Sequence, residues 1–391
     1  MKGLILSGGK GTRLRPLTYT RAKQLLPLAN RPVLFYAIDA LVEAGISQIG
    51  IIVGDTASEI QATVESARDW GADVAFTFIH QPEPLGLAHA VITAEPFLGA
   101  DPFVMFLGDN LIGDSLAPLA RAFLGPDPSS EQSSDHPYAA QILLKAVANP
   151  SQFGVAELEA DNEERPGAAA GQERGRAAGQ AVRVRRLIEK PQDPPSDLAL
   201  VGVYFFDARI HTATHAITPS ARGELEITDA IQWLIDQQYA VRASVLASYW
   251  IDTGKMEDIL DANRQVLERL ESRVDPSARV APDVTLTGTV VVQAGAQIEN
   301  SVIRGPAIIG ERAVIRDAFI GPFSSIDHDV EIEGSEIEYS IVLEHARIHR
   351  VHGRIDQSLI GRYAEVYTAP PRPHAHRLML GDHSATGLAS Q

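Results

Sequence analysis

Beyond residue 273 the chain repeats an aliphatic residue at about every sixth position, and this period constrains the fold more tightly than any other feature. A hexapeptide repeat with inward-pointing aliphatic residues is typical of a left-handed parallel β-helix, which would form about five coils here. Two offsets of four residues interrupt the series, and we expect them to be loops that leave the coil. The series comprises Val274, Val280, Leu286, Val292, Ile298, Ile308, Val314, Ile320, Ile326, Ile332, Val342, Ile348, Ile360 and Val366.

The first 255 residues follow a different pattern, in which strand-like and helix-like segments alternate. This alternation predicts an α/β domain with a largely parallel sheet between helices. Ligand-binding groups in such sheets gather at the carboxyl ends of the strands. The expected strands include residues 2–6, 49–54, 74–80, 103–107, 154–157 and 182–188, and the expected helices include Val33–Ala44 and Ser58–Trp70.

A chain of 391 residues is too long for one ordinary core, so we expect two domains. The α/β domain should cover residues 1–255, and a linker helix should follow over residues 256–273. The β-helix should cover residues 274–370 and end in a disordered tail, residues 371–391. Residues 157–181 are rich in Glu, Ala, Gly and Arg and short of large apolar residues, which predicts a flexible loop between two strands.

Composition excludes several classes of partner. A net charge of −16 disfavours nucleic acid, because its phosphate backbone would be repelled. The apolar runs are far shorter than a membrane span, and the N-terminus lacks the pattern of an export signal. Cysteine is absent, so the chain has neither disulfides nor thiolate metal sites, and a cytoplasmic location is expected.

A glycine-rich loop follows the first predicted strand. Gly8, Gly9 and Gly11 allow a sharp turn with backbone N–H groups pointing into the loop, and Arg13 and Lys23 add positive charge. Such a loop at a strand end is suited to a polyphosphate, which indicates a nucleotide.

Two better-known phosphate loops do not fit this segment. The third glycine of a dinucleotide fingerprint would fall at Leu14, and a Walker loop would need Lys-Ser/Thr where Thr12-Arg13 stands. The loop therefore belongs to a different type of nucleotide site.

The string GGKGTRLRPLT, followed by AKQLLP, resembles the sugar-1-phosphate nucleotidylyltransferase family, also called sugar-nucleotide pyrophosphorylases. The resemblance extends through Asp252-Thr253-Gly254 and implies a Rossmann-like domain. It also implies the reaction NTP + sugar 1-phosphate → NDP-sugar + pyrophosphate. The family pattern gives Arg13 and Lys23 catalytic roles, and it assigns the nucleotide to Gly8, Gly9, Gly11, Thr12 and Arg13.

Two aspartates stand at predicted strand ends, Asp109 in Leu-Gly-Asp-Asn and Asp252 in Trp-Ile-Asp-Thr-Gly. Carboxylates from separate strand ends can share a hard divalent cation, which prefers oxygen ligands. In the family resembled here the corresponding pair holds Mg²⁺ against the phosphates. We therefore expect Mg²⁺ as the cofactor.

The sugar side is expected around Glu189-Lys190-Pro191. The resemblance implies that Glu189 binds the sugar hydroxyls and that Lys190 binds the sugar phosphate as a catalytic cation. Gly154 would leave room for the hexose, and Gly202 and Arg222 would also contact the sugar side.

The segment from Gln81 to Ala90 resembles the base-binding loop of the family, which implies that Gln81 reads the base, with Gln24 as a second reader. A glutamine amide offers both the acceptor and the donors that a pyrimidine edge requires. Gly86 would let the base lie against the backbone, and we expect His89 to be a packing residue. The Gln-Leu-Leu-Pro pattern after Lys23 is closer to thymidylyltransferases than to uridylyltransferases.

The combined pattern resembles long-form glucose-1-phosphate thymidylyltransferases, which carry an appended β-helix and serve deoxysugar or glycan pathways. The expected substrates are dTTP and α-D-glucose 1-phosphate, and the expected assembly is a homo-oligomer. A UTP- or ATP-dependent enzyme of the same family is an open alternative.

Two further alternatives have different consequences. A second, acyltransferase activity would use a histidine of the β-helix as its base, but no acetyl-CoA pattern surrounds His328, His345, His349 or His352. A non-catalytic regulatory or scaffold protein would be expected to lose Arg13, Asp109 or Asp252, and all three are present.

Overall fold

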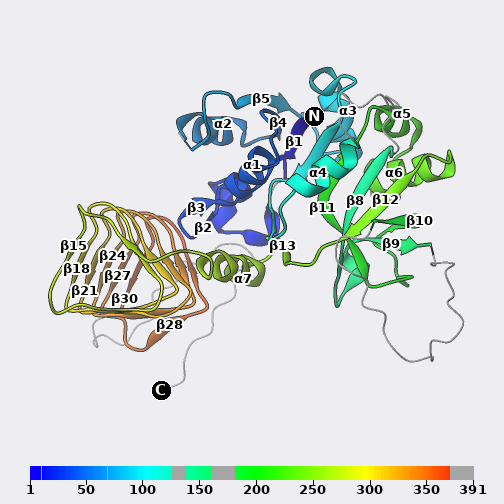
Figure 1. The fold of residues 1–391 in the computed structure, drawn as a ribbon. Helices are drawn as coiled ribbons and strands as arrows, with labels where there is room; N and C mark the ends of the chain where they lie inside the picture. Colours follow the sequence, from blue (N-terminus) through cyan, green and yellow to red (C-terminus); the bar gives the residue numbers. More distant parts are fainter. Residues whose placement is uncertain (10, 68, 126–137, 160–180, 370–391) are drawn as a thin grey trace, which may run out of the picture. The chain divides into compact units, whose positions relative to one another are not determined.

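The computed structural model describes residues 1–369 apart from residues 10, 68, 126–137 and 160–180 (Figure 1). The chain divides into two compact units, Met1–Leu270 and Glu271–Gln391. Most of the predicted loop over residues 157–181, and the predicted tail over residues 371–391, lie outside the described residues. In the part that is described, no helix is long and apolar enough to span a bilayer.

The first unit is built on a mixed sheet, which has nine strands among the described residues, in the order β5-β4-β1-β6-β11-β8-β12-β10-β9. Strands β5, β4, β1 and β6 are parallel, as are β8 and β12, whereas β11 and β10 run antiparallel to their neighbours. The bounds are β1 Lys2–Leu6, β4 Gln48–Val53, β5 Ala75–His80, β6 Phe103–Leu107, β8 Ala140–Ala146, β9 Gly154–Leu158, β10 Ala181–Glu189, β11 Leu198–Phe206 and β12 Val241–Val245.

Helices cover both faces of this sheet (Figure 1). Leu4 and Leu6 of β1 pack in one core, whereas Ile5 packs in the other. Burial on both faces explains why β1 is a continuous apolar run without polar alternation. The first core is covered by α3 (Leu87–Leu98), α5 (Arg209–Ala216) and α6 (Ile227–Asp236), and the second by α1 (Val33–Glu43), α2 (Ala57–Ser66) and α4 (Ala117–Leu124).

Helix ends follow the sequence signals at α1 but not at α2. Helix α1 ends before Gly45, whose φ of 82° is left-handed. Helix α2 was predicted to reach Trp70 but ends at Ser66. The ring of Trp70 packs edge-on against Phe35 and Phe76, so this apolar residue fills a loop and does not extend the helix.

A small ribbon and the last helix of the unit complete the first fold. Strand β7 (Asn110–Ile112) pairs antiparallel with β13 (Trp250–Asp252), and β2 (Pro27–Leu28) pairs with β3 (Arg31–Pro32). Helix α7 (Met256–Leu267) packs on β13 and β2, and its buried Asn263 accepts a hydrogen bond from the Ala29 backbone at 2.8 Å. The helix expected to be a linker over residues 256–273 is therefore an integral part of the first unit.

The second unit is the three-sided parallel β-helix that the hexapeptide repeat predicts. In the described part its sheets have six, six and five strands, each paired in parallel with the equivalent strand one coil later. The first sheet contains β14 Arg273–Val274, β17 Val290–Val292, β20 Ala307–Ile309, β23 Ser324–Ile326, β26 Ile341–Val342 and β29 Leu359–Ile360. The second contains β15 Arg279–Val280, β18 Gln297–Glu299, β21 Val314–Arg316, β24 Glu331–Glu333, β27 Arg347–His349 and β30 Glu365–Tyr367. The third contains β16 Thr285–Thr287, β19 Val302–Arg304, β22 Phe319–Ile320, β25 Glu336–Glu338 and β28 Arg354–Asp356.

The register of the middle coils differs from the predicted series. Ile309 lies beside Val292, and Ile315 lies beside Ile298, so the predicted inward positions Ile308 and Val314 are each one residue too early. Several sides of the coil span five residues instead of six, for example from Ile315 to Ile320. The irregularity is thus distributed over short sides of the coil, whereas the sequence series placed it in two four-residue loops.

Each unit has its own apolar core, since the third core cluster contains only β-helix residues. A chain ending at Leu270 should therefore stay folded and retain detectable nucleotidyl transfer, while its oligomeric state or thermal stability changes. Light scattering, a melting curve and a pyrophosphate assay on the truncated and full chains test this. A folded fragment with an unchanged oligomeric state and no activity would contradict a purely assembly or regulatory role for the β-helix.

Candidate functional site

The predicted metal ligands meet through the small β7–β13 ribbon. Asp109 lies between β6 and β7, and Asp252 is the last residue of β13, opposite Asn110 of β7. The hydroxyl and the backbone N–H of Thr253 both donate to the carbonyl of Asp109, at 2.8 Å and 3.1 Å. Two residues 143 positions apart (252 − 109) are thereby fixed side by side.

Lys23 contacts both aspartates. It lies in a short 3₁₀ turn, η3 (Lys23–Leu25), and its Nζ is 2.5 Å from Asp109 Oδ2 and 3.7 Å from Asp252 Oδ1. The lysine side chain is only 9 % exposed, whereas Asp252 keeps 37 % of its side chain exposed. Two effects raise the pKa of Asp252: partial burial, which is the larger, and repulsion from Asp109. The positive charge of Lys23 lowers this pKa and so opposes the rise.

The donor set of this cluster fits a hard divalent cation. Two carboxylates held at one point repel each other, and only one buried cation, that of Lys23, contacts both within the described residues. Carboxylate oxygens are the ligands that Mg²⁺ prefers, and Mg²⁺ usually keeps several waters in addition. Asp109 and Asp252 can therefore supply the protein ligands of such an ion.

The glycine loop brings Arg13 to the same place. Gly11 has a left-handed φ of 58°, and a Cβ added to it would lie 2.9 Å from Cβ of Lys23, so only glycine fits this turn. Thr12 and Arg13 follow in the turn η1 (Thr12–Leu14), and both are exposed. The guanidinium of Arg13 and the carboxylate of Asp252 both border Gly254, at 3.4 Å and 3.5 Å from the position of an added Cβ.

Asn110 is a site residue that the sequence prediction missed. It is buried, its Nδ2 donates to Asp109 Oδ1 at 3.0 Å, and its Oδ1 accepts from Trp250 Nε1 at 2.6 Å. The amide therefore orients the carboxylate of Asp109. A buried polar residue directly after a predicted ligand was the available signal, because such a side chain needs partners.

The predicted sugar-side residues form a second cluster. Gly154 and Glu189 are paired across β9 and β10, and Glu189 Oε1 lies 3.2 Å from Arg222 Nη1 and 3.7 Å from Lys190 Nζ. Thr228, another residue missed from the sequence, donates to Glu189 Oε2 at 3.2 Å. An added Cβ at Gly154 would lie 2.7 Å from Thr228 Cγ2 and 3.1 Å from Glu189 Oε2, so any larger residue would crowd this cluster.

Aromatic and amide contacts join the two clusters. The ring of Phe153, next to Gly154, packs edge-on against Trp250 with centroids 5.1 Å apart. The backbone N–H of Lys190 donates to the carbonyl of Phe153, and Trp250 donates to Asn110. Gly202 of β11 also borders Asn110, because an added Cβ would lie 2.7 Å from Asn110 Oδ1.

The two predicted base-reading glutamines flank the glycine loop. Gln24 is 2 % exposed and Gln81 is 8 % exposed. The Oε1 of Gln81 lies 3.4 Å from the position of a Cβ on Gly8, and the Nε2 of Gln24 lies 3.7 Å from that of a Cβ on Gly9. Oε1 of Gln24 has no hydrogen-bond partner within the described part of the chain. A buried acceptor without a partner is costly unless a ligand supplies a donor.

The fold requires a glycine at position 86, for a reason that the sequence did not reveal. Its φ is 110°, and an added Cβ would lie 2.4 Å from the carbonyl oxygen of Leu225. The backbone of Leu225 also donates to Leu85 and accepts from Ala88. The segment before α3 is therefore held against the segment that carries Arg222.

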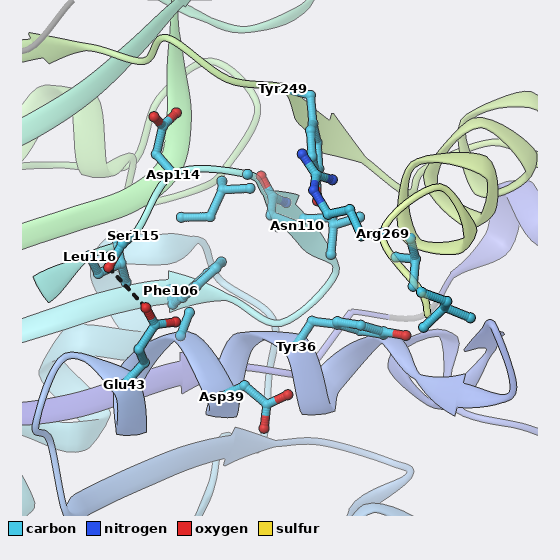
Figure 2. A pocket seen from close by; sticks show the side chains of 16 residues that line it. Tyr36, Asp39, Glu43, Phe106, Asn110, Asp114, Ser115, Leu116, Tyr249 and Arg269 are labelled. Atoms are coloured by element: carbon cyan, nitrogen blue, oxygen red, sulfur yellow. Dashed lines mark hydrogen bonds between the residues drawn. The ribbon is translucent and has the colours of Figure 1, made fainter. Parts of the chain in front are cut away.

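A separate pocket of about 340 Å³ lies beside helix α1 (Figure 2). The guanidinium of Arg269 lies 4.2 Å from the ring centroid of Tyr249, and Ser115 donates to Glu43 at 3.1 Å. Asn110 also lines this pocket, so it adjoins the Asp109 cluster through one residue. None of the site residues predicted from the sequence lines it.

The histidines considered as acyltransferase bases lie on the β-helix. His328 and His345 pack edge-on with centroids 5.4 Å apart, and His328 Nδ1 is 2.8 Å from Asp329 Oδ2. Arg312 donates to both oxygens of Asp329, at 2.8 Å and 2.7 Å, and holds the pKa of this carboxyl well below its usual range. His349 Nδ1 lies 4.0 Å from Glu333 Oε2, so these histidines contact acidic or aromatic neighbours on adjacent coils of the solenoid surface.

Comparison with known proteins identifies the family of this chain. Residues 2–269 match the model of the nucleotidyl transferase family. The chain is 47 % identical over 390 residues to a glucose-1-phosphate thymidylyltransferase of Streptomyces griseus, covering all of both chains. It is 41 % identical to the low-salt glycan biosynthesis nucleotidyltransferase Agl11 of Haloferax volcanii, covering 99 % of this chain and all of that protein.

A solved structure resembles the first unit. It is a Bacillus anthracis protein assigned as a glucose-1-phosphate thymidylyltransferase and solved in complex with sucrose. The match has a TM-score of 0.56 and 30 % identity, and it covers 70 % of this chain and 97 % of that one. The fold, the family match and the full-length relatives together define a nucleotidyltransferase. The chain belongs to the nucleotidyl transferase family.

Asp109→Asn or Asp252→Asn should abolish Mg²⁺-dependent turnover without unfolding the protein. Each change removes one of two anionic ligands. Because the folded-state pKa of Asp252 is raised, its ionised form costs stability above that pKa, so Asp252→Asn should melt at or above the wild-type temperature without metal.

The matched control is Asp258→Asn, which makes the same charge change beside Lys255 at the start of α7. Pyrophosphate release across a Mg²⁺ titration and melting curves in chelator provide the readout. Near-normal turnover of either ligand variant at millimolar Mg²⁺ would contradict the assignment.

Proposed function

We propose that this enzyme is a glucose-1-phosphate thymidylyltransferase, which converts dTTP and α-D-glucose 1-phosphate to dTDP-glucose and pyrophosphate. The observation that carries the proposal is the convergence of Arg13, Lys23, Asp109 and Asp252 at one edge of the sheet, beside two buried amides. Such an arrangement of cations and carboxylates suits the transfer of a phosphoryl group between two anions.

The reaction needs charge neutralisation and alignment. An oxygen of the sugar phosphate, already anionic at neutral pH, forms a bond to the α-phosphorus of the nucleotide. The bond from that phosphorus to the bridging oxygen breaks, and pyrophosphate leaves with the electron pair. No general base is required, so the chain's task is to hold two repelling anions in line and to stabilise the charge that develops.

Each group of residues has a part in this scheme. Arg13 and Lys23 stabilise charge on the transferring and departing phosphates. Lys190 and Arg222 are the cations beside Glu189, where they can bind the sugar phosphate while Glu189 accepts hydrogen bonds from sugar hydroxyls. The loop glycines Gly8, Gly9 and Gly11 offer backbone N–H groups to the nucleotide phosphates.

Asp109 and Asp252 would hold Mg²⁺, the divalent ion that we infer from their oxygen donors. When bound, this ion supplies positive charge that offsets the repulsion between the two phosphates. Lys23 holds the carboxylates together and neutralises part of their charge.

Two observations support the proposed substrates. The Streptomyces relative is named a glucose-1-phosphate thymidylyltransferase, and this chain aligns with it from end to end, including the β-helix. Gln24 and Gln81 are buried amides that can pair with the edge of a pyrimidine. We also propose a cytoplasmic homo-oligomer, in which the β-helix contributes to assembly.

Pyrophosphate release across a panel of nucleotides and sugar phosphates tests the proposed substrates. We expect the highest kcat/KM with dTTP and glucose 1-phosphate, the substrates that the name of the full-length Streptomyces relative indicates. The two amides match the edge of thymine or uracil and disfavour ATP and dCTP. The panel contains dTTP, UTP, ATP and dCTP, each with glucose 1-phosphate and with N-acetylglucosamine 1-phosphate. A clear preference for UTP or ATP would replace the assignment with the corresponding pyrophosphorylase of the same family.

Arg13→Ala should lower kcat by a factor on the order of 10²–10³, the loss expected for one preorganised charge donor. Nucleotide binding should suffer less, because the charge that Arg13 meets develops mainly in the transition state. Arg15→Ala is the comparison, since Arg15 lies over the ring of Tyr19 at 4.8 Å and its loss should cost much less. An effect of Arg13→Ala confined to KM would mean that Arg13 only positions the nucleotide.

A further inference from the structure

His89, which the sequence suggested was a packing residue, has a specific polar contact. It lies in the first turn of α3, and its Nδ1 is 2.9 Å from Nε2 of Gln81. Gln81 follows β5 directly and is 8 % exposed. This hydrogen bond therefore acts on a buried amide whose other atoms face the glycine loop.

The contact matters because a carboxamide has two orientations of nearly equal shape. Rotation by half a turn exchanges its oxygen, which only accepts hydrogen bonds, with its nitrogen, which only donates them. With Nε2 donating to His89 Nδ1, Oε1 of Gln81 points toward Gly8, 3.4 Å from the position of an added Cβ. This direction requires the tautomer of the imidazole that carries its proton on Nε2, since the tautomer with its proton on Nδ1 would donate to the amide oxygen and hold the amide turned by half a turn.

We propose that His89 is a positioning residue that sets base specificity by fixing the orientation of the Gln81 amide. This inference rests on the proposed function, in which Gln81 reads the base. In the fixed orientation Gln81 offers an acceptor and its second N–H toward the ligand. Thymine and uracil match this pattern, because a ring N–H stands next to a carbonyl oxygen.

Cytosine presents the opposite pattern on the same edge, a ring nitrogen that accepts beside an amino group that donates. Adenine presents the same reversed pair. The hydrogen bond from Gln81 to His89 thus selects keto pyrimidines against cytosine and adenine. It does not distinguish thymine from uracil, which share this edge.

The side-chain amide of Gln24, the other predicted base reader, lacks the contact that constrains the amide of Gln81. Oε1 of Gln24 is buried and accepts no hydrogen bond in the described part of the chain. No protein contact at this oxygen therefore fixes the orientation of the Gln24 amide. Gln81 instead has a protein partner, and with the imidazole proton on Nε2 its donor and acceptor positions are set before a ligand arrives. Preorganisation of this kind favours one ligand pattern at little cost on binding.

The test compares variants at position 89 in the full-length protein. His89→Phe keeps a planar ring but removes the acceptor. His89→Asn places an oxygen near the position of Nδ1, whereas the amide of His89→Gln reaches the position of Nε2 instead. Thr93→Val is the matched control in the same helix, because Thr93 donates to the backbone carbonyl of His89 at 2.8 Å and does not contact the Gln81 amide.

The readout is the ratio of kcat/KM for dTTP to that for dCTP. His89→Phe should lower this ratio about five- to tenfold, the effect of one neutral hydrogen bond, with dTTP losing and dCTP gaining. His89→Asn should recover most of the ratio, His89→Gln should not, and Thr93→Val should match the wild type. A loss of packing alone would slow both nucleotides equally and leave the ratio unchanged.

An unchanged ratio in His89→Phe, or equal ratios in the Asn and Gln variants, would overturn the role of His89 while normal dTTP turnover upholds the proposed function. A wild-type protein that releases no pyrophosphate with any nucleotide would instead contradict the proposed function. Affinities for dTTP and dCTP from calorimetry on the same variants then still decide whether His89 sets the orientation of Gln81.

Discussion

The site depends on holding two carboxylates next to each other, which electrostatics alone would oppose. Asp109 and Asp252 come from distant parts of the chain, and the antiparallel β7–β13 ribbon and the two hydrogen bonds from Thr253 fix their separation. Lys23 offsets part of the repulsion at 2.5 Å and 3.7 Å. Burial, and after it the repulsion from Asp109, raises the pKa of Asp252, so a cation bound between the two carboxylates would stabilise their ionised forms.

The same ribbon connects the proposed metal ligands with the proposed sugar-binding residues. Trp250 donates to Asn110, which in turn orients Asp109, and the ring of Trp250 packs against Phe153 beside Gly154. A displacement of β13 would therefore disturb both clusters together. Helix α7 follows the Asp252-Thr253-Gly254 motif and packs on β13 and β2. It therefore stabilises the strand that carries Asp252.

Sequence reasoning located the strands, the glycine loop and the residues that gather at the strand ends, because each has a local signal. Residue spacing alone could not reveal that the coils of the β-helix shorten to sides of five residues, since Val314 and Ile315 are both aliphatic and only the backbone register decides between them. Trp70 misled the prediction of α2 for a similar reason, because an apolar residue that fills a loop looks like part of a helix face.

Long-range polar contacts were also beyond the sequence. Asn110, Thr228 and His89 contact partners that the chain brings together only after folding. Asn110 stands beside a predicted ligand, but the groups that its amide would contact could not be read from the sequence.

The two ends of the site use different physical means, and this division follows from what each must do. At the proposed phosphate end the groups are charged, and Asp252 and Arg222 are partly exposed, which suits anions that arrive and leave with their water. At the proposed base end Gln24 and Gln81 are neutral and almost fully buried. A site discriminates between bases when the wrong base leaves a buried donor or acceptor without a hydrogen bond. The free-energy cost of that unpaired group is large only where water is excluded and the amide cannot turn. In the proposed scheme the partner of the Gln81 amide is therefore as much a part of recognition as the amide itself.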